Sequence, residues 1–231
     1  MNEPAANPHA IYDTVLFDLD GTLSDSSPGI LRCLEAAFAD LGLPWLDEPT
    51  ARSLLGPPFW HTLPPLVGKD RVEEAVAAYR RHYVDDGGMF ETSVYDGIAE
   101  VLKALSDKGI RLAVATSKPE QHATEILGHL GLAGHFETIG GDTLDGQRDS
   151  KALVIGAVLD RLGNPDPGTV LMVGDRSQDV LGAAAHGIAC AGALWGYGSV
   201  EELTEAGAAW LCQRAADLVD QILYPRIATT N

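Results

Sequence analysis

Two aspartates near the N-terminus carry the strongest chemical signal. Residues 17–23 read FDLDGTL and follow a short apolar run. Because side chains alternate along an extended strand, Asp18 and Asp20 project to the same side. Gly21 then lets the chain turn closely around whatever the two carboxylates hold. The spacing indicates a ligand site built from carboxylate oxygens.

An Asp-x-Asp-Gly pattern also occurs in calcium-binding loops. The EF-hand loop needs further oxygen ligands and a glutamate at its twelfth position. In this chain that position is Gly29. The calcium-loop interpretation is therefore the weaker one.

A second acidic motif follows another apolar run. Residues 173–179 read VGDRSQD and contain Asp175 and Asp179. A Gly-Asp pair alone is a common turn. Its position adds weight, since ligands of an open parallel sheet bind outside the carboxyl ends of the strands. Thr116 also follows an apolar run, so we expect this hydroxyl and the two acidic motifs to meet at one site.

Four carboxylates at one site need positive partners, because like charges at short range cannot all stay ionised. A hard divalent cation with oxygen ligands, Mg²⁺ above all, supplies two positive charges. Lys151 supplies a third from the start of its helix, where backbone N–H groups also favour anions. Lys118, beside Thr116 and Ser117, is a candidate for a fourth.

Carboxylates, a hydroxyl, a lysine and Mg²⁺ together fit phosphoryl transfer, in which positioning and charge neutralisation provide most of the catalysis. The chain contains no Gly-x-Ser-x-Gly elbow, Walker loop, Gly-x-Gly-x-x-Gly, His-Glu-x-x-His or Cys-x-x-Cys motif. The sequence therefore offers no competing catalytic signature.

The elements that must position these residues follow from the hydrophobic pattern. Short apolar runs predict strands buried on both faces of a parallel sheet, at residues 15–17, 112–115, 170–173 and 188–191, with 136–139 as a weaker fifth. Helical spacing predicts helices from a cap at Asp96 to Gly109, from Ser117 or Pro119 to Gly131, and from Lys151 to Leu162. Ser199 and Glu202 predict a capping box at the start of another helix.

The stretch between the first strand and Asp96 breaks the alternation. A helix is predicted to open at Ser27-Pro28 and to end at Gly42. A second helix is predicted from Asp70, with Glu73 completing a capping box, to about residue 84. This stretch is expected to form a helical insert on top of the sheet.

Strands that alternate with helices predict an α/β fold with right-handed crossovers, a doubly wound parallel sheet that carries an inserted α-helical domain. The core is expected at residues 13–26 and 94–231, the insert at 27–93, and a flexible tail at 1–12.

The composition excludes several classes of protein. Of 231 residues, 45% are hydrophobic and 21% charged, which suits a globular domain. The net charge of −17 argues against nucleic-acid binding and gives an anionic substrate no long-range attraction. No apolar run approaches the ~20 residues that cross a bilayer, and the N-terminus has no secretory signal. We expect a cytoplasmic protein with a small-molecule substrate and no membrane partner; the sequence does not indicate its oligomeric state.

Three cysteines, Cys33, Cys190 and Cys212, are far apart in the chain. Their number and spacing give neither a disulfide framework nor a zinc site. They are expected to be small buried hydrophobic residues.

In their order and their strand-end positions, these motifs resemble the haloacid dehalogenase superfamily of phosphohydrolases. The resemblance covers nearly the whole chain from about Thr14 and rests on DLDGT at residues 18–22, Thr116, Lys151, and Gly174-Asp175 with Asp179. The insert resembles the small α-helical cap of that family. WGYGS at 195–199 and LGPP at 55–58 resemble the phosphoglycolate phosphatase branch.

The resemblance implies a Mg²⁺-dependent phosphatase that works through an aspartyl-phosphate. Asp18 is then the nucleophile and also one of the metal ligands. Asp20 protonates the leaving group and later takes a proton from water, while its backbone carbonyl binds the metal. Thr116, with Ser117, binds the phosphoryl oxygens. Lys151 neutralises the phosphoryl charge and orients Asp18.

The resemblance further implies that Asp175 binds Mg²⁺ directly, with Asp179 as a ligand or as a support to one. One departure concerns Lys151, since many relatives have proline after this lysine and here Ala152 follows. The substrate would be contacted by Arg52, Gly56, Pro57, Lys118 and Arg176, with Trp60 and His61 as further guesses within the insert.

Several alternatives remain open. A 5'-nucleotidase-type phosphatase and a phosphomutase share the fold. A dehalogenase is disfavoured because a halide needs no proton and Asp20 is present. A phosphonate hydrolase needs a cap lysine, and Lys69 is the only lysine of the insert. A non-enzymatic phospho-acceptor or binding module, such as a receiver domain, carries no helical insert and is shorter.

Overall fold

The computed structural model describes residues 12–56, 59–143 and 148–223. The chain divides into two compact units. The first contains residues up to 24 and from 94 onward, and the second contains residues 25–93. The expected tail at 1–12 lies outside the described residues apart from Tyr12, which is buried.

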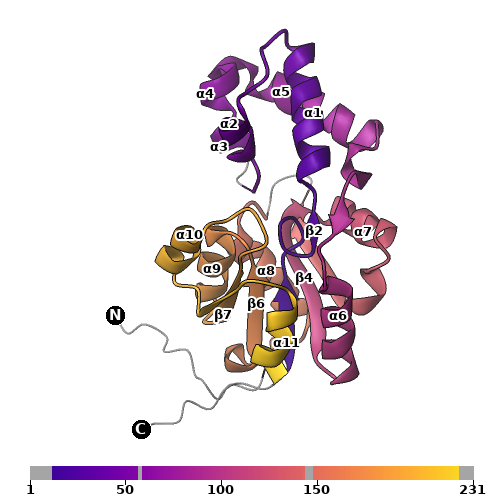
Figure 1. Ribbon diagram of the computed structural model, residues 1–231, viewed down its shortest axis with the longest axis vertical. Coiled ribbons are helices and arrows are strands. Elements are labelled where there is room, and N and C mark those ends of the chain that lie inside the picture. The colour runs from indigo at the N-terminus through magenta and orange to yellow at the C-terminus, as the bar shows by residue number, and fades with distance from the viewer. Residues whose placement is uncertain (1–11, 57–58, 144–147, 224–231) are drawn as a thin grey trace. The chain divides into compact units, whose positions relative to one another are not determined.

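A six-stranded sheet forms the centre of the first unit (Figure 1). Its strands, in the order β5-β4-β1-β6-β7-β8, are β5 (Thr138–Asp142), β4 (Arg111–Pro119), β1 (Thr14–Phe17), β6 (Val170–Gly174), β7 (Ala189–Ala193) and β8 (Trp210–Cys212). All neighbouring strands pair in parallel. From β1 the chain adds strands first on one side and then, from β6 onward, on the other. The carboxyl ends of β1 and β6 therefore form a topological switch point, where sheets of this kind bind ligands.

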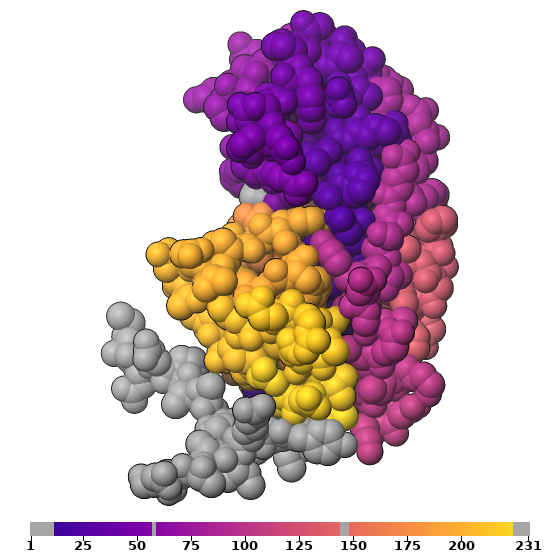
Figure 2. Space-filling model, viewed as in Figure 1, coloured from indigo at the N-terminus to yellow at the C-terminus, as the bar shows by residue number. Residues whose placement is uncertain are grey.

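Helices cover both faces of this sheet. They are α6 (Ile98–Asp107), α7 (Glu120–His129), α8 (Lys151–Arg161), α9 (Ser177–Ala184), α10 (Val200–Ala206) and α11 (Ala216–Leu223), with 3-10 turns at Ala133–His135 and Pro167–Thr169. On one face, α8 and α9 bury Val154, Ile155 and Val180 against the even-numbered side chains of β1 and β6. The helices α6 and α11 do not belong to this cluster and lie side by side (Figures 1 and 2). Residues 15, 16 and 17 are all fully buried, as a strand covered on both faces requires.

The predicted strands and helices of this unit are confirmed, with three corrections. The edge strand β8 and the helices α9 and α11 were not predicted, and the three residues of β8 are too few to show a periodic pattern. Gly97, in a left-handed conformation, caps α6 in place of Asp96. Ser199 does accept a hydrogen bond from the Glu202 backbone, but the Glu202 carboxylate accepts from Ser177 N and Arg176 Nε and leaves the capping box open.

The second unit is helical. Short strands β2 (Ser24–Asp25) and β3 (Ser93–Val94) pair where the chain enters and leaves it. Between them are α1 (Ser27–Asp40), α2 (Glu48–Arg52), α3 (Phe59–Thr62), α4 (Pro64–Val67), a 3-10 turn at Lys69–Arg71, α5 (Val72–Arg80), a π-helical turn at Arg81–Asp85 and a 3-10 turn at Gly88–Phe90. The buried faces of α1 and α5 pack together.

The second predicted helix of the insert is wrong in detail. Residues 70–73 form no capping box, because α5 starts after Arg71 and has no side-chain cap. The Arg71 guanidinium instead donates to Glu74 and to the Leu41 carbonyl. The predicted end at about residue 84 is confirmed, although the last five residues, Arg81–Asp85, form a π-helical turn after α5 ends at Arg80. The short helices α2, α3 and α4 were not predicted because prolines interrupt their pattern.

The three cysteines are free and buried, as predicted. Across the described residues, every helix is too short or too polar to cross a membrane.

Candidate active site

The loop after β1 is fixed by its own hydrogen bonds. Asp18 N donates to the Val173 carbonyl of β6, which continues the sheet by one residue. The chain then folds back, and the backbone N–H groups of Leu23 and Ser24 both donate to the Leu19 carbonyl. Leu19 N donates to Asp18 Oδ1 at 2.8 Å. The sequence thus holds the first aspartate in one orientation at the carboxyl end of a buried strand.

Lys151 is the first residue of α8, and Ser150 caps that helix by accepting from Leu153 N. Its side chain is only 4% exposed. Its ammonium lies 2.9 Å from Asp18 Oδ1 and 2.6 Å from Asp179 Oδ1. It also donates to the Ala115 carbonyl at 3.0 Å. The ammonium therefore forms two ion pairs and donates one hydrogen bond, so oxygen atoms from three segments surround it.

Asp175, directly after β6, is held through both carboxylate oxygens. Thr22 Oγ1 donates to Oδ1 at 3.1 Å, and Tyr197 N donates to Oδ2 at 2.8 Å. Residue 175 has no exposed surface. Because one donor comes from the loop after β1 and the other from the loop after β7, Asp175 joins three segments that are distant in sequence.

Glycines enclose the same carboxylate. A Cβ at Gly21 would lie 2.2 Å from Asp175 Oδ2, and a Cβ at Gly196 would lie 2.4 Å from the Asp175 Cβ. A Cβ at Gly198 would lie 1.9 Å from the Asp175 carbonyl oxygen. These positions have no room for a side chain, so the WGYGS segment is a close-fitting wall of the site.

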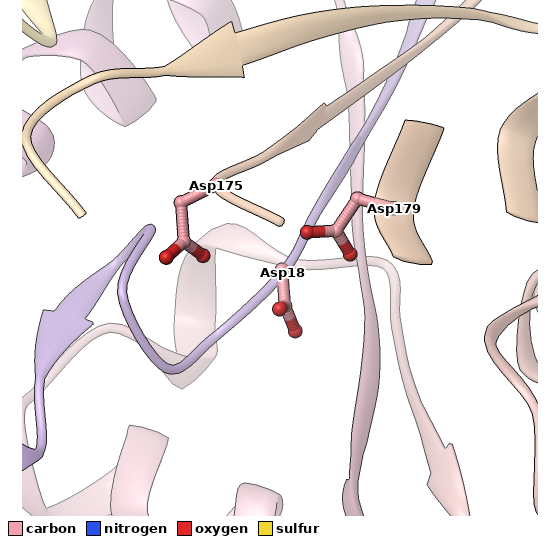
Figure 3. A group of neighbouring side chains, drawn as sticks. All are labelled: Asp18, Asp175 and Asp179. Carbon is pink, nitrogen blue, oxygen red and sulfur yellow. The ribbon is translucent and has the colours of Figure 1, made fainter. Parts of the chain in front are cut away.

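Three buried carboxylates converge in this region (Figure 3). Asp18 and Asp175 come from the ends of β1 and β6, and Asp179 comes from α9. One oxygen of each lies within 4.8 Å of the others. This is a set of hard oxygen donors at a spacing that one divalent cation can bridge.

Negative charge is in excess at the site when all three aspartates are ionised. Burial raises the pKa of Asp18, Lys151 lowers it and Asp179 raises it again, with a net pKa of about 6. Burial also raises the pKa of Asp175 well above its usual range, and Asp179 and Asp18 add to that rise. Burial lowers the pKa of Lys151, but Asp179 and Asp18 together raise it above its usual value, so this lysine stays charged. One ammonium faces three carboxylates, and a bound cation would relieve the excess negative charge.

Asp20 and Lys118 form a second pair at the same edge of the sheet. Lys118 Nζ lies 2.9 Å from Asp20 Oδ2, and the two side chains are 7% and 19% exposed. Thr116, on the same strand as Lys118, is buried, whereas Ser117 between them is exposed. All of the residues to which sequence reasoning gave a catalytic or metal role therefore lie at the carboxyl ends of β1, β4 and β6 or at the starts of α8 and α9.

The choice of substrate residues stays a prediction, since Arg52 and Gly56 belong to one unit and Lys118 and Arg176 to the other. Arg176 pairs with Glu202 at 2.9 Å, and Arg52 pairs with Glu48 on the surface of the insert. Gly56 is exposed in the insert, and Pro57 lies outside the described residues. The further guesses Trp60 and His61 lie in α3. The structure gives none of these insert residues a place relative to the core.

Sequence reasoning missed the supports of Asp175, namely Thr22 and Tyr197 N. Thr22 belongs to the DLDGT motif, but nothing in the pattern says that its hydroxyl donates to a residue 153 positions later. The WGYGS segment was noted only as a resemblance, and its glycines were the available signal for a close approach of backbone to the site.

The fold and the site define a class of protein. The family model of haloacid dehalogenase-like hydrolases matches residues 15–193, and the chain belongs to that family. Its relatives in that family include phosphatases, and this protein is a phosphatase.

Three relatives of known name are similar to this chain over most of its length. The tyrosine-protein kinase PtkA of Mycobacterium tuberculosis is 44% identical over 197 residues, which cover 85% of this chain and 67% of PtkA. A 5'-nucleotidase of Pseudomonas aeruginosa is 42% identical over 194 residues, covering 83% of this chain and 87% of that protein. A phosphoglycolate phosphatase of Aquifex aeolicus is 36% identical over 184 residues, covering 79% and 85%.

The solved structures agree with this placement. The crystal structure of a predicted phosphatase from Clostridium acetobutylicum superposes with a TM-score of 0.85 at 36% identity. The match covers 92% of this chain and 99% of that one.

Proposed function

We propose that this phosphatase hydrolyses a small-molecule phosphate monoester in a Mg²⁺-dependent reaction through an aspartyl-phosphate on Asp18. The observation that carries the proposal is the buried group of Asp18, Asp175 and Asp179 around Lys151, with Asp20 beside it. Such a group suits the transfer of a phosphoryl group, because the transferred group is anionic and is stabilised mainly by positive charge.

Asp18 supplies the nucleophile. Leu19 N and Lys151 both donate to Oδ1, so Oδ2 is the oxygen that attacks phosphorus. A bond forms between Asp18 Oδ2 and phosphorus while the bond from phosphorus to the ester oxygen breaks. Asp20 gives a proton to the departing oxygen, and the alcohol leaves.

Hydrolysis of the aspartyl-phosphate completes the cycle. Asp20, now ionised, takes a proton from water, and the water oxygen attacks phosphorus. The bond from phosphorus to Asp18 Oδ2 breaks, which restores the Asp18 carboxylate and frees inorganic phosphate. Two displacements with one covalent intermediate replace a single difficult hydrolysis.

Lys151 orients the Asp18 carboxylate, and Thr116 binds the phosphoryl group. The Lys151 ammonium is fixed by three acceptors and keeps the Asp18 carboxylate oriented. The buried Thr116 hydroxyl, at the end of the fully buried part of β4, is available to the phosphoryl oxygens. Groups that are held in place before the substrate binds lower barriers without a cost of reorganisation.

The donor set fits Mg²⁺. Asp18, Asp175 and Asp179 offer carboxylate oxygens within 4.8 Å of one another, and the family resemblance adds the Asp20 carbonyl. When bound, the ion would neutralise charge on the carboxylates and on the phosphoryl oxygens. The raised pKa values of Asp18 and Asp175 support this, because they mark a place where negative charge is in excess.

Two substrate classes lead the proposal. The 5'-nucleotidase and phosphoglycolate phosphatase relatives make nucleoside 5'-monophosphates and phosphoglycolate the first compounds to compare. The insert is proposed to act as a cap that selects among them, since the core residues act on the phosphoryl group common to both. A mutase would also need residues that hold a bisphosphate, and none of the site residues given above has that role.

PtkA raises a second candidate, because a tyrosine-protein kinase is 44% identical to this chain. In that case the phosphoryl group would pass to a tyrosine hydroxyl instead of water. The chain has neither a Walker loop nor a Gly-x-Gly-x-x-Gly motif for a nucleotide. Hydrolysis, which needs only water and Asp20, therefore remains the proposal.

The test is phosphate release from a panel of small monoesters that includes phosphoglycolate, nucleoside 5'-monophosphates and 4-nitrophenyl phosphate. We expect release that depends on Mg²⁺, stops with a chelator, and falls by about 10⁴-fold or more in Asp18→Asn. A parallel assay with ATP and a tyrosine-containing protein acceptor measures transfer to tyrosine. Transfer without release of phosphate, or release that survives Asp18→Asn, would overturn the proposal.

A further inference from the structure

The two motif aspartates pair with two different lysines. Asp18 pairs with Lys151 and Asp20 pairs with Lys118, both at 2.9 Å. The first pair is part of the charge cluster already described. The second lies outside the group formed by Asp18, Asp175 and Asp179, and the reaction sequence above gives Lys118 no role.

The backbone of Lys118 is held tightly. Lys118 N donates to Thr116 Oγ1 at 3.3 Å. On the other side, a Cβ at Gly141 of β5 would lie 2.3 Å from the Lys118 carbonyl oxygen, so the two strands are in close contact there. Its neighbour Pro119 pairs with Asp142 after a register shift in the β4–β5 ladder. The backbone of Lys118 is therefore held by Thr116 and packed against β5 at the end of β4.

The contact with Asp20 is directional. Lys118 meets Oδ2, whereas Asp20 Oδ1 is buried and makes no hydrogen bond among the described residues. A buried carboxylate oxygen without a partner costs free energy, so its retention needs an explanation. Lys118 therefore fixes Oδ2 of Asp20, and Oδ1 stays available to a substrate or a water molecule.

We infer that Lys118 is a positioning residue that holds Asp20 through Oδ2, so that Oδ1 exchanges the proton with the leaving oxygen and then with water. This inference rests on the proposed function, because it assumes that Asp20 is the acid and base. It replaces the role of Lys118 as a substrate contact. The proton travels between Asp20 Oδ1 and the ester or water oxygen, and Lys118 keeps its own three protons throughout.

The inference predicts a dependence on the leaving group. Proton donation matters most when the departing oxygen is basic and least when it is a stable anion. A series of phenyl, 4-nitrophenyl and 2,4-dinitrophenyl phosphate varies this property while the phosphoryl group stays the same. The measured quantity is kcat/KM, which reports the step that breaks the ester bond.

The experiment compares Lys118→Met, Asp20→Asn and the double variant, with Lys103→Met as the matched control. Lys103 also pairs with an aspartate, Asp107 at 2.6 Å, but lies exposed on α6. We expect Lys118→Met to lower kcat/KM about 100-fold for phenyl phosphate and less than about 10-fold for the dinitrophenyl ester, within the range of general-acid effects. In the Asp20→Asn background the same substitution should have an effect of less than about 3-fold, since coupled residues are not additive. Lys118→Arg should restore part of the loss.

The outcomes separate the alternatives. If Lys118→Met lowers kcat/KM equally for all three esters, and if this factor multiplies with the factor from Asp20→Asn in the double variant, then Lys118 binds the phosphoryl group. That result would overturn the inference. So would unchanged kcat/KM in Lys118→Met. If Asp20→Asn itself shows no leaving-group dependence, the proposed role of Asp20 fails first. Lys118→Gln is measured alongside and replaces Lys118→Met if thermal unfolding shows that the latter does not fold.

Discussion

The two units of the molecule use ion pairs of similar length in opposite surroundings. In the core, Lys151 Nζ lies 2.9 Å from Asp18 Oδ1, and the two side chains are 4% and 12% exposed. In the insert, Arg32 Nε lies 2.7 Å from Glu91 Oε2, and the side chains are 44% and 46% exposed. Distance alone therefore does not tell which pair matters, because burial changes the energetic meaning of the contact.

The same contrast holds for each unit as a whole. In the core, the charged side chains of Asp18, Lys151, Asp175 and Asp179 are buried. In residues 25–56 and 59–93, no aspartate, glutamate, lysine or arginine is buried. Buried charges are costly and weak evidence for stability, so their concentration at one end of the sheet points to function.

The largest expected effect comes from the buried lysine. Lys151→Met leaves Asp18 and Asp179 together without their shared ammonium. We expect the free energy of unfolding to fall by about 3–5 kcal/mol, as for other broken buried pairs. Urea unfolding in the presence of a chelator measures it. A loss below about 1 kcal/mol, the value of an exposed pair, would remove the contrast between the two units.

The sequence could predict this part of the site because the chemistry and the topology are local. Asp18, Asp20 and Asp175 directly follow apolar strands, and parallel strands end at one edge of a sheet. Lys151 could be predicted because it stands at the start of a helix with a clear apolar pattern. Thr22 and Tyr197 N could not be predicted as donors to Asp175, since their contact depends on how distant loops fold against one another.

Mg²⁺ should stabilise the core in a pH-dependent way. At a concentration about 100 times its dissociation constant, a ligand of the native state adds about 2.7 kcal/mol of stability. Burial raises the pKa of Asp18 to about 6, so below that pH the folded carboxyl is protonated and the ion must displace a proton. The increase in Tm on adding Mg²⁺ should therefore be large at pH 7.5 and shrink as the pH falls through about 6. An increase that stays constant down to pH 5 would contradict the assignment of Asp18 to the cation site.

A smaller effect is expected from the wall of the site. A Cβ in Gly196→Ala would lie 2.2 Å from the Gly21 carbonyl oxygen and 2.4 Å from the Asp175 Cβ. The displaced carboxylate should bind Mg²⁺ about 10- to 100-fold more weakly, as when other supports of metal ligands are lost. Calorimetric titration with Mg²⁺ measures this without an activity assay. Gly134→Ala is the control, because a Cβ there meets nothing within 4 Å. Equal affinities in the two variants would refute the role of the WGYGS segment.

The smallest effect belongs to the insert. Arg32→Met breaks the exposed pair with Glu91 and should lower the free energy of unfolding by less than about 1 kcal/mol. The effect should shrink further at high salt, which screens exposed charges. Urea unfolding at low and high salt checks both points, and a loss as large as that of Lys151→Met would contradict the comparison.

The insert was also the part that the sequence predicted least well. Its first helix, α1, shows a long apolar stripe and was predicted, whereas α2, α3 and α4 have four or five residues each. Elements that short depend on tertiary packing, so local patterns do not reveal them. Arg52 and Gly56 stay predictions as substrate residues, because local patterns do not show which side chains of the insert would face a substrate.

The most direct test of the account is whether Asp18 carries the phosphoryl group. Asp20→Asn, which slows hydrolysis of the intermediate, is mixed with 2,4-dinitrophenyl phosphate and Mg²⁺, quenched in acid and analysed by mass spectrometry. The account predicts one added phosphoryl group on the peptide that contains Asp18, removable by hydroxylamine. Release of phosphate with no phosphoryl group on Asp18 at any time, or with the group on another residue, would contradict it.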